Sequence, residues 1–338
     1  MLDMMIDSHK GLYSVEFDHR IDINKITALG THFIVDANVQ ERLGNLPNMI
    51  VIKAEESQKS YEGASWIIEE LIKRGLNRSS HLVAIGGGIT QDITCWIAST
   101  FMRGIDWSFV PTTLLAQADS CIGSKSSINF LKYKNIVGTF YPPKHVLIVD
   151  QFRTTLSEAD IKSGMAEIIK LAIINGDEPH FLTTITGTTE DIHYALNIKK
   201  YYIEQDEFDA GIRNILNYGH CFGHAIESAS NYQIPHGIAV AMGMDLANGL
   251  ADLRLGTSFY EKYHSILDSL YRDFNHILYD TDMVISAMSK DKKNTAQYAN
   301  IIVPSHIGMV KKHHIRDEIF VKHCKFLLQR IKDPNASL

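Results

Sequence analysis

The sequence predicts an α/β fold in which a parallel sheet covered by helices precedes a mostly helical region. The first 150 residues alternate short apolar runs with helical patterns, whereas long helical patterns dominate from about Leu156 onward. Alternating strands and helices are typical of a parallel sheet with both faces covered. A chain of 338 residues also favours two domains. We therefore predict domains at residues 1–150 and 151–338.

Each predicted element follows from its apolar pattern. The predicted strands are HFIVD (32–36), MIVIKA (49–54), HLVAIGGG (81–88), WSFVPTT (107–113) and VLIVD (146–150). Residues 61–73 have a helical period between the second and third of these strands. In the second half, helical patterns cover 158–175, 190–204, 209–230, 236–255, 258–271 and 315–331, and one β-like stretch, ANIIVPSHIGMV, covers 299–310.

Composition excludes several classes of protein. There are 33 Lys and Arg against 39 Asp and Glu, a net charge of −6, which argues against a nucleic-acid partner. The four cysteines are far apart and form no CxxC pair, which favours a reducing compartment. The N-terminus lacks the features of a signal peptide, and no apolar run approaches the roughly 18 residues of a membrane span. We expect a soluble cytoplasmic protein that binds neither membrane nor nucleic acid.

A glycine turn follows the third predicted strand. Gly86, Gly87 and Gly88 precede a segment that can begin a helix, with Asp92 in its first turns. Glycines let the backbone approach a ligand closely, and a helix N-terminus attracts phosphate. The pattern is not GxGxxG, so the ordinary dinucleotide fingerprint is absent. A nucleotide or phosphate site and a tight turn without a ligand both remain open.

Polar residues gather after the fourth predicted strand. They are Thr112, Thr113, Asp119, Lys125, Lys134 and Asn135. Ligands of open α/β sheets bind outside the carboxyl ends of the strands, and lysines there suit a phosphorylated or carboxylated ligand. Each lysine could equally be an ordinary solvated surface residue.

A second polar group lies in the helical half. Arg213, Asn217, His220 and His224 are spaced at i, i+4, i+7 and i+11, so a helix would place them on one face. Gly219 and Gly223 leave open that part of the segment is a turn. Unpaired polar groups within so apolar a segment would cost about 1–3 kcal/mol each in a core.

Glu167, Lys170 and His236 add further polar side chains to apolar helical patterns. One carboxylate and two imidazoles suit Zn²⁺ with a fourth position open for substrate. The spacing of His220 and His224 invites both as ligands, but the glutamate of HExxH is missing. A set of satisfied core histidines with a buried Glu–Lys pair would give the same pattern. The number of such residues together favours a functional site.

Several motifs in order carry a family resemblance. They are GGGITQD, FMRG, PTTLLAQADS, KNIVGTFYPP, GMAEIIK, DEFDAGIRNILNYGHCFGHAIE, HGIAVAMGM and DKK. Over about residues 30 to 310 the chain resembles the 3-dehydroquinate synthases of the sugar phosphate cyclase superfamily. Glycerol-dehydrogenase-like enzymes share the GGG turn, but the ordered set, above all RxxLNxGHxxGHAIE, is highly specific.

The resemblance implies an N-terminal Rossmann-like NAD-binding domain and a mostly α-helical C-terminal metal-binding domain. It implies conversion of 3-deoxy-D-arabino-heptulosonate 7-phosphate to 3-dehydroquinate and phosphate. NAD⁺ would take a hydride transiently, phosphate would leave by elimination, the hydride would return, and an intramolecular aldol step would close the ring.

The resemblance also implies a set of site residues. The ligands of Zn²⁺, or of Co²⁺, would be Glu167, His220 and His236. NAD would contact Asp36, Glu56, Lys59, Gly87, Gly88, Asp92, Thr112, Thr113, Lys134 and Thr155. The sugar phosphate would contact Asp119, Lys125, Asn135, Lys170, Lys199, Arg213, Asn217, His224 and either Lys292 or Lys293. His224 would shuttle protons, and Arg103 would reach the phosphate from a neighbouring subunit, which implies a homodimer.

Some positions depart from the family pattern. Ser124 stands in the usual GGK, Cys221 in GHT, Ile238 in HGEAV, and Leu171-Ala172 in KYG. These departures leave open a related cyclase of secondary metabolism, such as an amino-dehydroquinate synthase. Retention of Lys199, Arg213, Asn217 and His224 favours a substrate with a carboxylate. A metal-dependent polyol dehydrogenase and a non-catalytic binding homologue also remain open.

Overall fold

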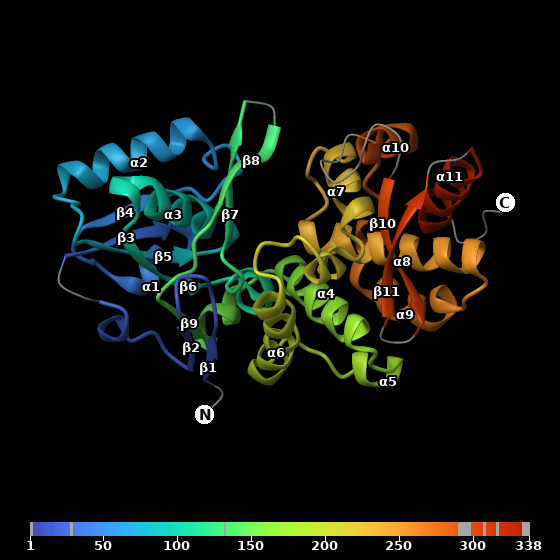
Figure 1. Ribbon diagram of the computed structural model, residues 1–338, viewed down its shortest axis with the longest axis horizontal. Helices are drawn as coiled ribbons and strands as arrows, with labels where there is room; N and C mark the ends of the chain where they lie inside the picture. Colours follow the sequence, from blue (N-terminus) through green and yellow to red (C-terminus); the bar gives the residue numbers. More distant parts are fainter. Residues whose placement is uncertain are drawn as a thin grey trace. The chain divides into compact units, whose positions relative to one another are not determined.

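The computed structural model describes residues 3–27, 30–131, 133–289, 299–306, 309–315 and 318–332. The chain divides into two compact units (Figure 1). Unit 1 consists of Met1–Leu156 and Lys200–Asp209, and unit 2 of Ser157–Lys199 and Ala210–Leu338. The division falls a few residues after the predicted boundary, and it assigns a short later segment to unit 1, which the sequence pattern did not predict.

Seven strands of the described chain form the sheet of unit 1, in the order β1-β2-β9-β6-β5-β3-β4. The five predicted strands are confirmed as β3 (Thr31–Asp36), β4 (Met49–Ile52), β5 (His81–Gly86), β6 (Asp106–Pro111) and β9 (His145–Val149). They run parallel to one another and to β2 (Tyr13–Asp18), whereas β1 (Met4–Ile6) pairs antiparallel with β2. β1 and β2 were not predicted because both are short and only partly apolar.

Helices and loops cover both faces of this sheet. α2 (Tyr61–Lys73) and α3 (Gly88–Thr100) lie along one face (Figure 1). α2 begins where predicted because the Ser60 hydroxyl accepts a hydrogen bond from the Gly63 amide, an ordinary N-cap. On the other face, Phe33, Val35 and their neighbours pack under the 3₁₀ turn η1 (Ile23–Lys25), η2 (Ala37–Val39) and α1 (Gln40–Leu43).

A separate antiparallel hairpin follows β6. After the π-helical segment η4 (Ala116–Ser120), the chain forms β7 (Lys125–Phe130) and β8 (Tyr133–Phe140). The prediction that six polar residues lie together after the fourth predicted strand, which is β6, was therefore wrong in part. Thr112 and Thr113 directly follow β6, but Lys125, Lys134 and Asn135 lie on this hairpin. The alternating pattern that buries Ser126 and Ile128 was the available signal.

Unit 2 is built around one buried helix, α8 (His236–Leu255), whose residues from Gly237 to Ala251 are all buried, as expected for a helix enclosed by others. α4 (Glu158–Asn175), α7 (His220–Ala229), α9 (Phe259–Tyr271) and α11 (Glu318–Lys332) pack against it. The other elements are α5 (Pro179–Leu182), α6 (Thr189–Gln205, which extends into unit 1), η5 (Asp150–Thr155, in unit 1), η6 (Ile212–Asn217), η7 (Arg272–Phe274), α10 (Thr281–Ser289) and the hairpin β10 (Ala299–His306) and β11 (Met309–Ile315).

The helical predictions hold within a few residues except at two places. The predicted helix over 209–230 is interrupted, because η6 ends at Asn217 and α7 begins only at His220. The β-like stretch is a two-stranded hairpin that continues to Ile315, so α11 begins at Glu318 rather than at the predicted start. Within the described residues, no helix is both long and apolar enough to cross a bilayer.

Glycines let the helices of unit 2 approach one another at backbone contact. A Cβ on Gly243 of α8 would lie 2.0 Å from the Gly219 carbonyl oxygen, and one on Gly237 would lie 1.9 Å from the Ser163 carbonyl oxygen. Neither position has room for a side chain. This close packing holds the first turns of α7 and α8 beside α4, where the polar side chains of unit 2 converge.

Candidate functional site

The polar centre of unit 2 is formed by three helices. Glu167 lies in the middle of α4, His220 and His224 occupy the first two turns of α7, and His236 is the first residue of α8. Gly219, just before α7, has a left-handed φ of 78°. Because of that turn, Arg213 and Asn217 on η6 do not share an α-helical face with the histidines, which corrects the helical prediction.

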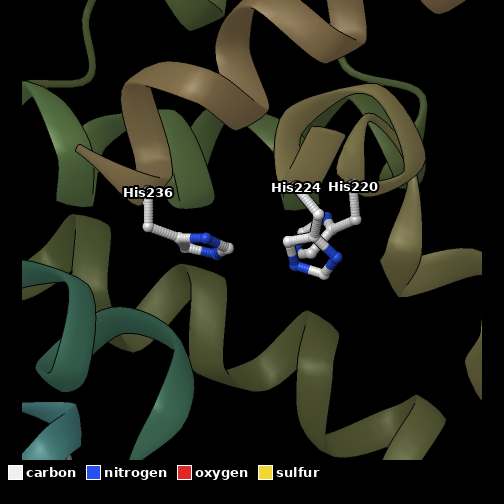
Figure 2. Close-up of side chains that lie close together, drawn as sticks. All are labelled: His220, His224 and His236. Atoms are coloured by element: carbon white, nitrogen blue, oxygen red, sulfur yellow. The ribbon is translucent and has the colours of Figure 1, made fainter. Parts of the chain in front are cut away.

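The imidazole rings face a common point. Figure 2 shows His236 reaching from α8 toward His220 and His224 on α7, and one ring nitrogen of each lies within 4.8 Å of the others. Glu167 Oε1 lies 3.7 Å from His220 Nε2 and 3.6 Å from His236 Nε2. Two ligand atoms of a tetrahedral zinc ion, each about 2.1 Å from it, lie about 3.4 Å apart. Glu167, His220 and His236 therefore have the spacing of ligands around one small cation.

The second nitrogen of each of these histidines has its own partner. His220 Nδ1 donates to the Tyr218 carbonyl oxygen at 3.1 Å, and His236 Nδ1 donates to Glu227 Oε2 at 3.0 Å. These hydrogen bonds assign the proton to Nδ1 and leave Nε2 facing Glu167, as is usual for metal-binding histidines. Glu227 was not among the site residues predicted from sequence. Its position seven residues after His220, on the same face of α7, was the signal.

Ile238, at the position where the family pattern has a glutamate, is fully buried in the core. The acceptor for His236 is Glu227, the last residue of the GHAIE motif. The orientation of His236 therefore does not depend on a carboxylate at position 238.

The charge state of the centre suits a cation. Glu167 is fully buried, and among the described residues neither of its oxygens accepts a hydrogen bond, although the Lys170 ammonium forms an ion pair with Oε2. Burial, and then the positive charge of Lys170, lower the pKa of His220 well below its ordinary value. Burial also opposes the charged form of His236, but the carboxylate of Glu227 raises the pKa of this imidazole to about 8. A buried carboxylate with two imidazoles is a donor set that Zn²⁺ accepts, and a bound metal would replace the second proton of His236.

The other predicted substrate residues of unit 2 have different environments. Lys170, Lys199 and Arg213 are buried, which is uncommon for lysine and arginine side chains. Asn217 is half-buried and donates to the Asn214 carbonyl oxygen at 2.9 Å, and His224 is exposed. η6, which carries Arg213, packs against α4, which carries Glu167 and Lys170. Lys292 and Lys293 lie outside the described residues.

The glycine turn of unit 1 lies where the strand order changes direction. From β3 the chain moves outward to β4 and then crosses back to β5, so β3 and β5 flank the switch point. Asp36 ends β3, and a Cβ on Gly86 at the end of β5 would lie 3.1 Å from the Asp36 Cβ. A Cβ on Gly88, the first residue of α3, would meet only Ser120 Oγ of the described chain, at 4.0 Å. The backbone at Gly88 is thus open to a ligand, at the place where α/β sheets bind dinucleotides.

Four of the predicted dinucleotide-binding side chains form a second cluster, between the β7–β8 hairpin and the loop before α2. Lys59 Nζ lies 2.6 Å from Asp92 Oδ2, and Lys134 Nζ lies 3.2 Å from Glu56 Oε1. Asn129 of β7 donates to Glu56 Oε1 and accepts from the Asn135 amide, which places Asn135 next to this cluster. The two ion pairs, Lys59 with Asp92 and Lys134 with Glu56, bring together residues that are far apart in the sequence.

The remaining predicted residues of unit 1 are distributed more widely. The buried Thr112 donates its amide to the Gly86 carbonyl oxygen, and Thr113 Oγ1 accepts from the Ala116 amide. Lys125 Nζ lies 2.6 Å from Asp209 Oδ2. Asp119 is half-buried in η4, whereas Thr155, in η5, and Arg103 are exposed.

Together, the two units define a class of protein: an α/β unit with a glycine turn at its switch point, joined to a helical unit with carboxylate and imidazole donors. Solved structures of this class share the fold. A 2-deoxy-scyllo-inosose synthase complexed with carbaglucose-6-phosphate, NAD⁺ and Co²⁺ is similar at a TM-score of 0.82, with 23% identity over 96% of this chain and 99% of that one. The valiolone synthase ValA from Streptomyces hygroscopicus subsp. jinggangensis 5008, with NAD⁺ and Zn²⁺ bound, gives 0.81 and 22% over 96% and 97%.

Sequence comparison identifies the family. The N-terminal and C-terminal domain models of 3-dehydroquinate synthase match residues 49–163 and 164–294. The 3-dehydroquinate synthase of Pyrococcus abyssi is 38% identical over 83% of this chain and 86% of its own length. That of Alkaliphilus metalliredigens is 34% identical over 90% of each. The chain belongs to the 3-dehydroquinate synthase family.

Proposed function

We propose that this protein converts 3-deoxy-D-arabino-heptulosonate 7-phosphate to 3-dehydroquinate and phosphate. The observation that carries this proposal is the convergence of His220 and His236 on one oxygen of buried Glu167, at 3.7 and 3.6 Å. The test is phosphate release by the purified protein loaded with Zn²⁺ and NAD⁺. Turnover of that substrate without net NADH supports the proposal, and its absence under saturating substrate contradicts it.

We assign the metal ligands to Glu167, His220 and His236. The rings of His220, His224 and His236 lie 5.3 to 5.6 Å from one another. His224 is the exposed member of this group, and we assign it the transfer of protons beside the metal. A bound Zn²⁺ or Co²⁺ would polarise a substrate hydroxyl and stabilise negative charge on its oxygen.

The ligand assignment is tested by zinc content after exhaustive dialysis. Glu167→Gln removes the charged ligand, so we expect the variant to lose bound zinc. Glu158→Gln on the same helix is the matched control, because the Glu158 side chain is 81% exposed. Full zinc occupancy in Glu167→Gln would show that the ligand set is wrong.

We assign NAD to the switch point of unit 1. The open backbone at Gly88, preceded by Gly87, suits the pyrophosphate, and Asp36 at the end of the neighbouring strand suits a ribose hydroxyl. The cluster of Glu56, Lys59, Asp92 and Lys134, with Thr112, Thr113 and Thr155, completes this proposed site. Bound NAD⁺ would accept a hydride from substrate and return it, so the oxidised cofactor is regenerated.

We assign the substrate anions to cationic and polar side chains predicted from the sequence. Buried Lys199 and Arg213 suit a carboxylate or phosphate, because ammonium and guanidinium groups form charge-assisted hydrogen bonds with such anions. Lys125 would exchange its pairing with Asp209 for the substrate. Lys170, beside Glu167, would place a positive charge next to the metal. The remaining assigned residues are Asp119, Asn135, Asn217, His224 and Lys293.

We further propose a cytoplasmic homodimer in which Arg103 completes the neighbouring subunit's site. None of the four cysteines, all of which are described, forms a disulfide, in keeping with a reducing compartment. Met102 and Arg103 have left-handed φ values of 46° and 71°, and such strained backbone is common at functional sites.

Subunit mixing tests this arrangement. Arg103→Ala and Glu167→Gln should each be inactive alone. If Arg103 acts across the interface, a mixed dimer has one site with both residues and regains activity. No recovery from dimers shown by mass spectrometry to be mixed would exclude the arrangement.

A related cyclase of secondary metabolism is the second candidate. Ser124, which stands in the usual GGK, has a left-handed φ of 61°, and its hydroxyl donates to Glu207 directly beside Lys125. Turnover of an amino analogue or of sedoheptulose 7-phosphate, without turnover of the heptulosonate, would favour this candidate. Net accumulation of NADH would favour a polyol dehydrogenase instead.

A further inference from the structure

A chain of buried polar groups runs behind the polar centre of unit 2. Tyr218 is fully buried and makes two hydrogen bonds in opposite directions. Its carbonyl oxygen accepts from His220 Nδ1, and its hydroxyl donates to Asn248 Oδ1 on α8. Tyr218 therefore connects one proposed metal ligand to a side chain that lies 30 residues further along the sequence.

The backbone at Tyr218 sets the direction of the carbonyl that contacts His220. Tyr218 lies between the end of η6 and the start of α7, and the next residue, Gly219, has a left-handed φ of 78°. The direction of the Tyr218 carbonyl decides which nitrogen of His220 carries the proton, and hence which nitrogen can bind a metal. The Tyr218 amide is held by the Ile215 carbonyl oxygen at 3.0 Å, and the hydroxyl contact with α8 holds the ring.

Asn248 belongs to a larger buried cluster on α8 and α9. Asp245, one turn earlier on α8 and fully buried, accepts from the Tyr271 hydroxyl at 2.6 Å and from His264 Nδ1 at 2.7 Å. Within the part of the chain that the structure describes, neither Asp245 Oδ1 nor Asn248 Nδ2 has a hydrogen-bond partner. A leucine at position 248 would leave the buried Tyr218 hydroxyl without its acceptor, so the asparagine side chain serves the contact with Tyr218.

We infer that Asn248 is a positioning residue for the metal ligand His220, and that it acts through Tyr218. The Asn248 side chain fixes the Tyr218 ring, the ring fixes the peptide, and the carbonyl keeps the proton of His220 on Nδ1. This inference rests on the proposed metal site. It adds that α8 orients both histidine ligands, His236 as its own first residue and His220 through this chain.

The experiment measures metal affinity, which does not depend on turnover. Tyr218→Phe removes only the hydroxyl, and Asn248→Leu removes the acceptor at similar volume. Loss of an outer-shell partner typically weakens metal binding by roughly 10- to 100-fold. We expect each variant to bind Zn²⁺ about tenfold more weakly, as measured by competition with a chelator of known affinity. We expect the double variant to lose no more than either single variant, because both remove the same hydrogen bond.

A spectroscopic readout and a control separate positioning from general destabilisation. The visible absorption bands of bound Co²⁺ report ligand geometry, so both variants should shift these bands. Tyr263→Phe is the control, since it removes the hydroxyl of another buried tyrosine of unit 2, which lies 3.4 Å from the Asp177 carbonyl oxygen. This control should keep the wild-type affinity and spectrum.

The measured affinities and spectra decide whether Asn248 positions His220, only stabilises unit 2, or lies beside no metal site. Wild-type affinity and spectrum in both Tyr218→Phe and Asn248→Leu would overturn the inference. Equal losses in these variants and in Tyr263→Phe would also overturn it, because the effect would then be one of stability. If the wild-type protein binds Zn²⁺ no better than Glu167→Gln does, the proposed metal site itself fails.

Discussion

His236 and Glu227 are joined across the loop between α7 and α8, with His236 Nδ1 3.0 Å from Glu227 Oε2. The carboxylate holds the imidazole proton on Nδ1 and directs Nε2 toward Glu167. It also raises the pKa of His236 to about 8, against the effect of burial. A residue nine positions away in sequence thus sets the state of a proposed metal ligand.

Removal of this carboxylate should weaken metal binding. In Glu227→Ala, His236 loses its acceptor and its fixed orientation, so we expect Zn²⁺ affinity to fall by roughly 10- to 100-fold. Glu227→Gln keeps an acceptor oxygen and should lose less. Chelator competition measures both, with Glu261→Ala, an exposed glutamate of α9, as the control. Unchanged affinity in Glu227→Ala would contradict this role.

Gly243→Ala should destabilise unit 2. The added Cβ would lie 2.0 Å from the Gly219 carbonyl oxygen, which is backbone and cannot move aside cheaply. We expect the free energy of unfolding to fall by about 1–3 kcal/mol, as for other overpacked cores. Because the shift displaces the turn before His220, zinc affinity should fall as well. Urea titration and chelator competition test this, and wild-type values in both would refute the close approach.

Gly88→Ala is the opposite case, since its Cβ would meet only Ser120 Oγ of the described chain, at 4.0 Å. We expect the free energy of unfolding to change by no more than about 0.5 kcal/mol. The methyl group would occupy the space assigned to the pyrophosphate, so NAD⁺ should bind at least roughly tenfold more weakly, about 1.4 kcal/mol. Calorimetric titration with NAD⁺ is the measurement. Unaltered affinity in this folded variant would move the dinucleotide site elsewhere.

The stability of unit 1 should depend on pH through two histidines at the amino-terminal edge of the sheet. Burial lowers the pKa of His81, which lies 2.9 Å from Ser108 Oγ, and that of His145. Since the unfolded chain binds protons at these sites more readily, their contribution to stability is present above a pH of about 6.5 and is lost as the pH falls through the lowered values.

Urea unfolding at several pH values between neutral and mildly acidic measures this effect. His81→Gln should show a smaller loss of stability on acidification than the wild type. The His19 side chain is 93% exposed, so His19→Gln should keep the wild-type pH dependence. If His81→Gln also keeps it, the titration of His81 does not contribute.

The predictions from sequence succeeded where a pattern is local. β3 and β5 are continuous apolar runs, and α2, α4 and α8 have the predicted bounds because their apolar periods and end residues agree. β7 and β8 were missed because a half-polar hairpin gains its stability from pairing with a partner strand rather than from its own composition. The helix expected over 209–230 breaks at Gly219, where a left-handed turn packs against Val240 and Met244 of α8.

By itself, the sequence determined the types of most elements, the order of the two halves and the donor residues, because each depends on residues close together in the chain. The tertiary structure alone decided that Glu167 faces two imidazole nitrogens, that Glu227 rather than residue 238 orients His236, and that Asn248 reaches Tyr218. These relationships depend on how closely α4, α7 and α8 approach one another. That distance is set by side-chain volume at the glycine contacts, which no single segment specifies.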